Sequence, residues 1–249
     1  MMNQKATWQQ MSIVYVVAAV ILVLDQASKW WVEATIPGGG VVYPIASIGQ
    51  YFNFLHAYNT GAAFGTFRGS GWVFSTVAVI VIGFIIYFNT QLPAQARLAR
   101  WALGLMMGGA AGNNLIDRFR LGHVTDFIHI NLRPLVENYP RLDFAILDWP
   151  IFNIADMAIV SGVITMVVLM WREEQFAAEQ QATLPPPPPP PVYNFAQPGW
   201  SQLPAPTTPA TAEDTRLVRF TLLGVVVWTA ALILSLGLAL RVLIGRRRR

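Results

Sequence analysis

Residues 11–31 read MSIVYVVAAVILVLDQASKWW, an apolar run in which Asp25 and Lys29 are the charged residues. About 20 apolar residues are what a helix needs to cross the hydrocarbon core of a bilayer. The run is too long for a secretory leader, carries charges near its end and lacks a clean small-x-small cleavage site, so it predicts a retained transmembrane helix rather than a signal peptide. Asp25 and Lys29 stand four residues apart, share one helix face and can pair there.

Outward from this run, the composition and three further apolar segments also indicate a membrane protein. Of the 249 residues, 54% are hydrophobic and 12% charged, and the mean hydropathy is +0.45. A soluble domain carries about twice that charged fraction. The further segments cover residues 71–88, 98–116 and 154–171. Together with the first run they predict four transmembrane helices.

The connecting segments predict the orientation of the chain. The short loop between the second and third segments carries Arg97 and Arg100 and no acid, which favours a cytoplasmic position. Residues 37–70 and 119–150 then face outward. Glycines around β-branched and aromatic runs in residues 37–70 predict a small sheet at the membrane surface, and residues 119–150 are expected at the interface.

The residue types that the chain lacks exclude several kinds of catalytic site. The chain has no cysteine, so disulfides, thiolate catalysis and cysteine-ligated metals are excluded. Its three histidines form no HExxH pair, which argues against a zinc metalloprotease. The net charge of +4 is not arranged as a basic stripe interleaved with aromatics, so no nucleic-acid partner is expected. No metal and no cofactor are predicted.

Polar residues near the ends of the segments are candidates for a site, because ionisable groups in membranes usually face a cavity or a protein interior. Asn114 and Arg118 share one helix face, and Asn113 and Asp117 share another. Asp117 is interpreted as a structural partner of Arg118 or of Arg120. The Gly- and Ala-rich residues 108–112 suit close helix packing in lipid.

Asp126 and Asp156 both fall at the predicted outer boundary. Taken alone, Asp156 is explained as a first-turn acid at a helix N-terminus, with Asn153 three residues before it. The Asp25–Lys29 pair is equally well explained as structural. Two neighbouring carboxylates, however, cannot easily both ionise and can share a proton. One can then activate water while the other protonates the carbonyl oxygen or the leaving amine.

These motifs, in this order, resemble the lipoprotein signal peptidase (signal peptidase II) family, a group of membrane aspartic proteases. The stretches are Asp25-x-x-Ser-Lys29, Asn59-x-Gly61-Ala-Ala-Phe, residues 112–118 followed by Val-x-Asp126-Phe-Ile, and Phe-Asn153-x-Ala-Asp156. The resemblance covers residues 10–172. It implies an all-α membrane fold: a core of four transmembrane helices with a small extracytoplasmic β-sheet cradle.

The resemblance also implies the reaction. Such an endopeptidase removes the signal peptide from diacylglyceryl-modified prolipoproteins, cutting before the lipidated cysteine, in the bacterial inner membrane near its extracytoplasmic face. Its partners are prolipoprotein substrates and membrane lipid, and a monomer is expected. Asn114 is preferred to Asn113 because it stands four residues before Arg118. The catalytic residues implied are Asp126 and Asp156, and those that bind substrate or support the site are Asn59, Gly61, Asn114, Arg118, Asn153, Asp25 and Lys29.

The C-terminal part of the chain falls outside the resemblance. Residues 173–215 include seven consecutive prolines and predict a disordered linker, interpreted as a spacer rather than a partner-binding motif. Residues 216–249 predict a fifth apolar helix with a basic tail. If this helix spans, its four terminal arginines lie outside, against the positive-inside tendency. A helix along the inner surface is the alternative.

Two other functions remain open from the sequence. A small transporter or proton channel could use the intramembrane charges as a relay, but a relay needs ionisable groups through the membrane depth. Only Asp25 and Lys29 are expected to lie deep. A catalytically inactive scaffold that tethers partners through its C-terminal extension is the third hypothesis, and the intact Asp126 and Asp156 argue against it.

Overall fold

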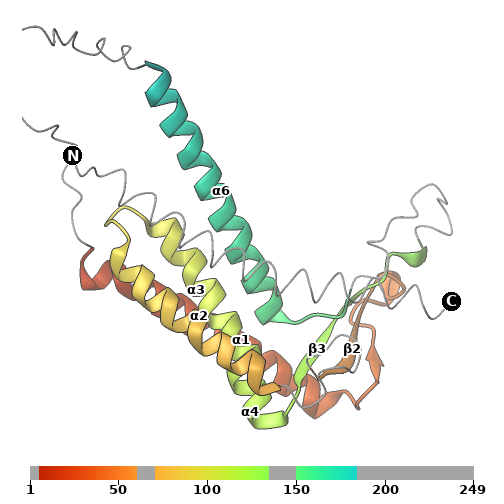
Figure 1. Ribbon diagram of the computed structural model, residues 1–249. Helices are drawn as coiled ribbons and strands as arrows, with labels where there is room; N and C mark the ends of the chain where they lie inside the picture. The colour runs from red at the N-terminus through yellow and green to blue at the C-terminus, as the bar shows by residue number, and fades with distance from the viewer. Residues whose placement is uncertain (1–5, 61–70, 135–149, 184–249) are drawn as a thin grey trace, which may run out of the picture.

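The computed structural model describes residues 6–60, 71–134 and 150–183. Long helices lie side by side, and a small sheet caps one end of them (Figure 1). The helical elements are α1 (Trp8–Thr35), the 3-10 turn η1 (Ala46–Ile48), α2 (Gly71–Gln91), α3 (Arg97–Ala111), the π-helical turn η3 (Gly112–Asp117), α4 (Arg118–Leu121) and α6 (Ile154–Thr183). The strands are β1 (Val41–Val42), β2 (Phe52–Asn59) and β3 (Val124–Ile130).

Three of the four predicted membrane helices are confirmed as long and apolar enough to span a bilayer. They cover Trp8–Thr35, Trp72–Gln91 and Ile154–Phe176. The third predicted segment, residues 98–116, is divided: α3 ends at Ala111 and the π-helical turn η3 follows. Arginines at its start and several glycines make α3 less apolar than its neighbours. Its crossing of the membrane therefore stays a proposal.

Helix α3 lies between α1 and α6, and glycine allows this close approach. A Cβ atom at Gly108 would lie 2.7 Å from the backbone oxygen of Ala18 in α1. One at Gly104 would lie 2.8 Å from the backbone oxygen of Val14. On the α6 side, a Cβ at Gly162 would lie 2.7 Å from the oxygen of Ala102. The small residues thus bring the helix backbones together, as the sequence predicted.

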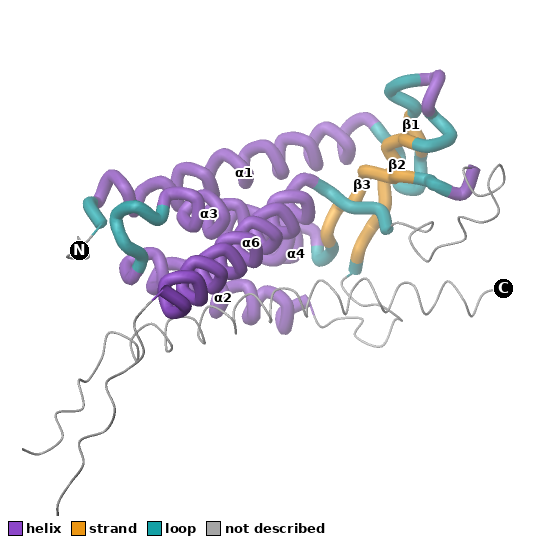
Figure 2. Tube along the Cα trace, turned by 90° about the horizontal axis from the view of Figure 1, so that it is seen from above, coloured by secondary structure: helices purple, strands orange, loops and turns teal. Residues whose placement is uncertain are grey.

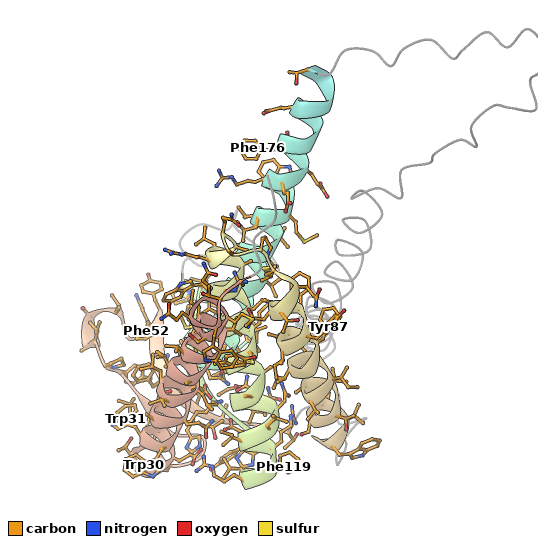
Figure 3. The ribbon with its side chains drawn as sticks, turned by 90° about the vertical axis from the view of Figure 1, so that its left-hand side faces the viewer. Trp30, Trp31, Phe52, Tyr87, Phe119 and Phe176 are labelled. Atoms are coloured by element: carbon orange, nitrogen blue, oxygen red, sulfur yellow. The ribbon has the colours of Figure 1, made fainter. Side chains whose placement is uncertain are left out.

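Exposed aromatic side chains mark the two ends of the bundle. Trp30, Trp31 and Phe119 gather at one end (Figure 3). Trp8 begins α1 at the opposite end and is exposed. From Trp8 to Trp30, the helical rise of 1.5 Å per residue gives about 33 Å, close to the thickness of a hydrocarbon core. Tryptophan favours the membrane–water interface, so these residues are placed as interfacial anchors.

A buried arginine ties the helices together at the Trp8 end. The guanidinium of Arg100 is fully buried and donates to the Oδ1 of Asn89 (3.2 Å) and to the backbone oxygens of Leu92 (2.9 Å) and Pro93 (2.8 Å). The Nδ2 of Asn89 donates in turn to the backbone oxygen of Met11 in α1 (2.9 Å). Carbonyl oxygens and one amide thus satisfy this cation.

The sheet is antiparallel, with strand order β1-β2-β3. The sheet predicted within residues 37–70 is present as β1 and β2, and β3 adds a strand from the following connection. Phe54 of β2 and Phe127 of β3 pack with Val32 and Ile36 at the end of α1. Figure 2 shows the three strands beyond that end of α1. This packing fixes β3, and with it Asp126, against the membrane helices.

The first residues of the predicted linker, 173–183, belong to helix α6. Helix α6 continues to Thr183 and projects beyond the other helices (Figure 1). Residues 173–183 are rich in Glu, Ala and Gln, which are good helix formers, so the helix ends only before the proline run. The proline run and the predicted fifth helix lie outside the described residues.

The glycine packing can be tested with a pair of substitutions. We expect Gly108→Ala to lower stability by about 1–3 kcal/mol, because its methyl group would overlap the α1 backbone. Gly83→Ala in α2 is the matched control, since a Cβ there meets nothing within 4 Å. Thermal unfolding in detergent, followed by tryptophan fluorescence, measures both. Equal melting temperatures for the two variants would contradict the packing argument.

Candidate active site

Asp126 lies on β3, where side-chain amides approach both of its carboxylate oxygens. The Nδ2 of Asn59, at the end of β2, donates to Oδ2 (2.9 Å). The Nδ2 of Asn153, just before α6, donates to Oδ1 (2.8 Å). Asp126 is buried, so these amides replace the water that an exposed carboxylate would have. The strand that carries Asp126 follows directly after α4.

Asp156 lies in the first turn of α6, as the sequence predicted. Its Oδ2 accepts from the backbone N–H of Asn153 (3.1 Å), and its own N–H donates to the Oδ1 of Asn153 (3.0 Å). This reciprocal pair has the pattern of a capping box, and the helix dipole favours the carboxylate. The Nδ2 of Asn113 donates to Oδ1 of Asp156 (2.8 Å). The carboxylate of Asp156 therefore both caps the N-terminus of α6 and belongs to the candidate site.

Asn153 connects the two acids. It is fully buried; its side-chain Nδ2 donates to the carboxylate of Asp126, and its backbone N–H donates to the carboxylate of Asp156. Its Nδ2 also lies 3.1 Å from the Oδ1 of Asn113 and 3.3 Å from the backbone oxygen of Thr125. One amide thus fixes the strand that carries Asp126 relative to the helix that carries Asp156.

A buried charged cluster supports this arrangement from the membrane side. The Nζ of Lys29 lies 2.8 Å from Asp25 and 2.8 Å from Asp117, and all three side chains are fully buried. Lys29 also donates to the Oδ1 of Asn113 (2.5 Å), whose Nδ2 binds Asp156. The predicted Asp25–Lys29 pair is present. The prediction that Asp117 pairs with an arginine is wrong, because η3 presents Asp117 to α1.

Asp25 also links α1 to the start of α6. Its Oδ1 accepts from the backbone N–H of Ala155 (3.0 Å), next to Asp156. Its Oδ2 lies where a side chain on Gly112 would project, since a Cβ there would be 2.5 Å away. Glycine at position 112 therefore leaves the space that the carboxylate occupies. Asp25 and Gly112 together bring α1, η3 and α6 to one point.

Arg118 is a cation close enough to Asp126 to be influenced by its charge. Its Nε donates to the Oδ1 of Asn114 (3.2 Å), and its guanidinium lies over the ring of Phe74, 4.7 Å from the centroid. Burial lowers the pKa of Arg118, while the carboxylates of Asp126 and Asp117 act to raise it. Within the described part of the chain, its buried Nη1 has no hydrogen-bond partner. That donor is available to an acceptor on a ligand.

The structure brings most of the predicted site residues together. Gly61 lies outside the described residues. Asn114 was preferred to Asn113, but Asn113 contacts Asp156, and Asn114 bonds to Arg118 instead. The helix face that Asn113 shares with Asp117 was the sequence signal that could have identified Asn113 as a site residue. The predicted residues that meet around the two acids are Asn59, Asn153, Arg118, Asp25 and Lys29.

The donor set around this site does not indicate a metal centre. Among the residues that the structure describes, no group of three His, Cys, Asp or Glu side chains is placed to hold an ion. The acids instead contact amides and, through Asn113, a lysine. Two carboxylates held by neutral donors, with an arginine beside them, can carry out proton transfer to and from a bound water.

Known proteins are similar to this chain in sequence and in fold. A lipoprotein signal peptidase of Moorella thermoacetica is 37% identical over 155 residues, which is 62% of this chain and 88% of that protein. One of Anoxybacillus flavithermus is 38% identical over 168 residues, covering 67% and 90%. A solved bacterial membrane enzyme aligns with a TM-score of 0.54 at 27% identity, over 70% of this chain and 94% of that one.

The shared region coincides with the part of the chain that builds the site. A second structure of a bacterial membrane enzyme covers 68% of this chain and 97% of its own, with a TM-score of 0.53 and 27% identity. The sequence model of signal peptidase (SPase) II matches residues 17–172, which include every residue of the site described above. The chain therefore belongs to the signal peptidase II family, and it is a multi-pass membrane protease.

Proposed function

We propose that this protein is an aspartic endopeptidase that removes the signal peptide from diacylglyceryl-modified prolipoproteins, cutting before the lipidated cysteine. Asp126 and Asp156 are the catalytic pair. The observation that carries the proposal is that Asn153 donates hydrogen bonds to both carboxylates, to Asp126 from its side chain and to Asp156 from its backbone N–H. Family membership supports the substrate class, since the relatives are lipoprotein signal peptidases.

The chemistry follows from two carboxylates that share one proton. The ionised acid removes a proton from water, and the water oxygen bonds to the scissile carbonyl carbon. The protonated acid donates to the carbonyl oxygen. As the C–N bond breaks, the acid that took the proton from water passes it to the departing amine, which becomes the N-terminus of the lipidated cysteine, and the other carboxylate takes a proton back from a hydroxyl of the intermediate, so that the pair is restored. The amides of Asn59, Asn113 and Asn153 hold the carboxylates in place throughout.

Arg118 suits the binding of a peptide carbonyl. Its guanidinium is positioned by Asn114 and by the Phe74 ring, and one buried N–H donor lacks a partner among the described residues. Hydrogen bonds from a charged donor are about twice as strong as neutral ones. A substrate carbonyl placed there would satisfy this donor and would lie beside Asp126.

The level of the site in the membrane fits a lipid-anchored substrate. Lys29 of the charged cluster directly precedes the exposed Trp30 and Trp31, which lie with Phe119 at one end of the bundle (Figure 3). The opposite end carries Arg97 and Arg100, which favour the cytoplasm. The site then faces the extracytoplasmic side of the bacterial inner membrane, where a diacylglyceryl group can diffuse laterally to it.

The transporter alternative lacks a route for ions. Between Arg100 at one end and the Asp25–Lys29–Asp117 cluster at the other, the helices contain no Asp, Glu, Lys or Arg. A proton relay needs such groups through the membrane depth. The charged groups near the site are also engaged in ion pairs and amide contacts. The observations therefore favour a protease over a channel.

Replacement of either acid by its amide tests the catalytic assignment. We expect Asp126→Asn and Asp156→Asn each to lower the cleavage rate of a lipidated prolipoprotein by about 10²–10⁴-fold, because the proton-transfer group is lost. Glu174→Gln, an exposed acid on the projecting part of α6, is the matched control. Substantial cleavage by either Asp variant would refute the assignment. Equal turnover of lipidated and unlipidated substrate would refute the substrate claim.

The adjacent asparagines provide a test of the positioning network. Asn113→Ala removes the link between Lys29 and Asp156 and should lower kcat by about 100-fold, since small displacements of catalytic groups carry such costs. Asn114→Ala, the matched variant, removes only the contact to Arg118 and should act mainly on KM. Steady-state kinetics in detergent separate the two. A larger loss of kcat in Asn114→Ala would contradict the geometry.

The C-terminal extension is proposed to be accessory, with the catalytic domain in residues 1–172, a linker in residues 173–215 whose first residues continue α6 to Thr183, and an apolar segment in residues 216–249. Truncation after Thr183 keeps the whole of α6 and should leave cleavage in proteoliposomes within about twofold of the full chain, because each described site residue precedes Arg172. Loss of cleavage in a folded truncation would show that the extension takes part in the reaction.

A further inference from the structure

The segment between α1 and β2, residues 37–50, is apolar on its exposed surface. Val41, Val42, Tyr43, Ile45 and Ile48 are between 40% and 59% exposed. Loops that contact water normally carry charge. Here residues 34–67 contain no Asp, Glu, Lys or Arg. We call residues 37–50 the apolar arm.

The apolar arm is held firmly by the sheet. The N–H of Gly39 donates to the backbone oxygen of His56 (2.9 Å), and the N–H of His56 donates to the oxygen of Gly40 (3.0 Å). Val41 and Val42 then pair with Leu55 and Phe54 of β2. The backbone of the arm is therefore held at the outer edge of the sheet, where β1 is the edge strand (Figure 2).

The arm continues the lipid-facing surface of α1. Trp30 and Trp31 are exposed on the last turns of that helix, and the Trp31 ring contacts Phe54 of β2, with ring centroids 5.8 Å apart. Phe54 pairs with Val42 of the arm. Apolar contacts thus link Trp31 to the arm through Phe54, while Glu33 of α1, the nearest charged residue before the arm, is paired with Arg120. This continuity points to the bilayer as the partner.

We propose that the apolar arm inserts into the outer leaflet at the boundary between headgroups and acyl chains, and anchors the sheet there. Val41 and Val42 are consecutive strand residues, so their side chains point to opposite faces. Both are exposed. A segment that is apolar on both faces suits immersion in lipid better than one-sided docking on a protein surface. Its lack of charge makes insertion independent of anionic headgroups.

Such an anchor would fix the depth of the site. Strand β2 pairs with the arm and ends at Asn59, which binds Asp126 of β3. The depth of the arm is therefore transmitted to the acids through strand pairing. This inference extends the proposed function, because it sets where the bond to be cut must lie relative to the membrane surface. Its test does not depend on cleavage.

The absence of cysteine allows single-site labelling of an otherwise unmodified chain. Nitroxide labels at Val42→Cys and Ile45→Cys in phosphatidylcholine vesicles would report accessibility to oxygen and to a water-soluble nickel chelate. Val20→Cys, exposed on the membrane-spanning part of α1, is the lipid reference. Glu174→Cys, exposed on the projecting end of α6, is the aqueous reference.

We expect the ratio of oxygen to nickel accessibility at both arm positions to be severalfold higher than at Glu174→Cys and to approach that at Val20→Cys. High salt or added anionic lipid should not change it. A ratio equal to that at Glu174→Cys would place the arm in water and overturn the proposal. Low accessibility to both reagents, or shielding that increases with the protein-to-lipid ratio, would indicate a protein cover or a second copy and would overturn it equally.

Discussion

The rest of the site depends on the buried ion pairs that the ammonium group of Lys29 forms with Asp25 and Asp117. Taking a lysine and two carboxylates out of water costs several kcal/mol per ion unless each has partners. The cluster provides them: Lys29 contacts both acids and Asn113, and Asp25 accepts from the Ala155 N–H. These contacts join α1, the π-helical turn and the start of α6.

Hydrogen bonds from neutral amides connect this buried cluster to Asp156 and Asp126 and fix the positions of these two acids. Asn113 connects the cluster to Asp156, and Asn153 connects Asp156 to Asp126 on the sheet. A charge at the end of the membrane helices therefore positions a strand that lies outside them. The glycines along α3 make this possible, because they allow α1 and α6 to approach the same helix closely.

Much of the membrane helix pattern could be predicted from the sequence, because apolar runs of sufficient length have few alternatives in lipid. The division of the third segment could not be predicted, since the π-helical turn at residues 112–117 depends on tertiary contacts. The geometry of that turn directs Asn113 to Asp156 and Asn114 to Arg118. Strand β3 was also missed, because its pairing with β2 links residues far apart in sequence. The polar motifs named Asn153 as a residue that supports the site, but its hydrogen bonds to both Asp126 and Asp156 could not be predicted, because they depend on how β3 and the start of α6 pack together.

The measurement that tests the central claim most directly is cleavage of lipidated prolipoprotein in ¹⁸O-labelled water, followed by mass spectrometry of product and enzyme. If Asp126 and Asp156 act only as acid and base, one ¹⁸O atom enters the new carboxylate of the signal peptide. Both aspartates then stay unlabelled after many turnovers. Incorporation of ¹⁸O into Asp126 or Asp156 would show a covalent acyl intermediate and would contradict the account.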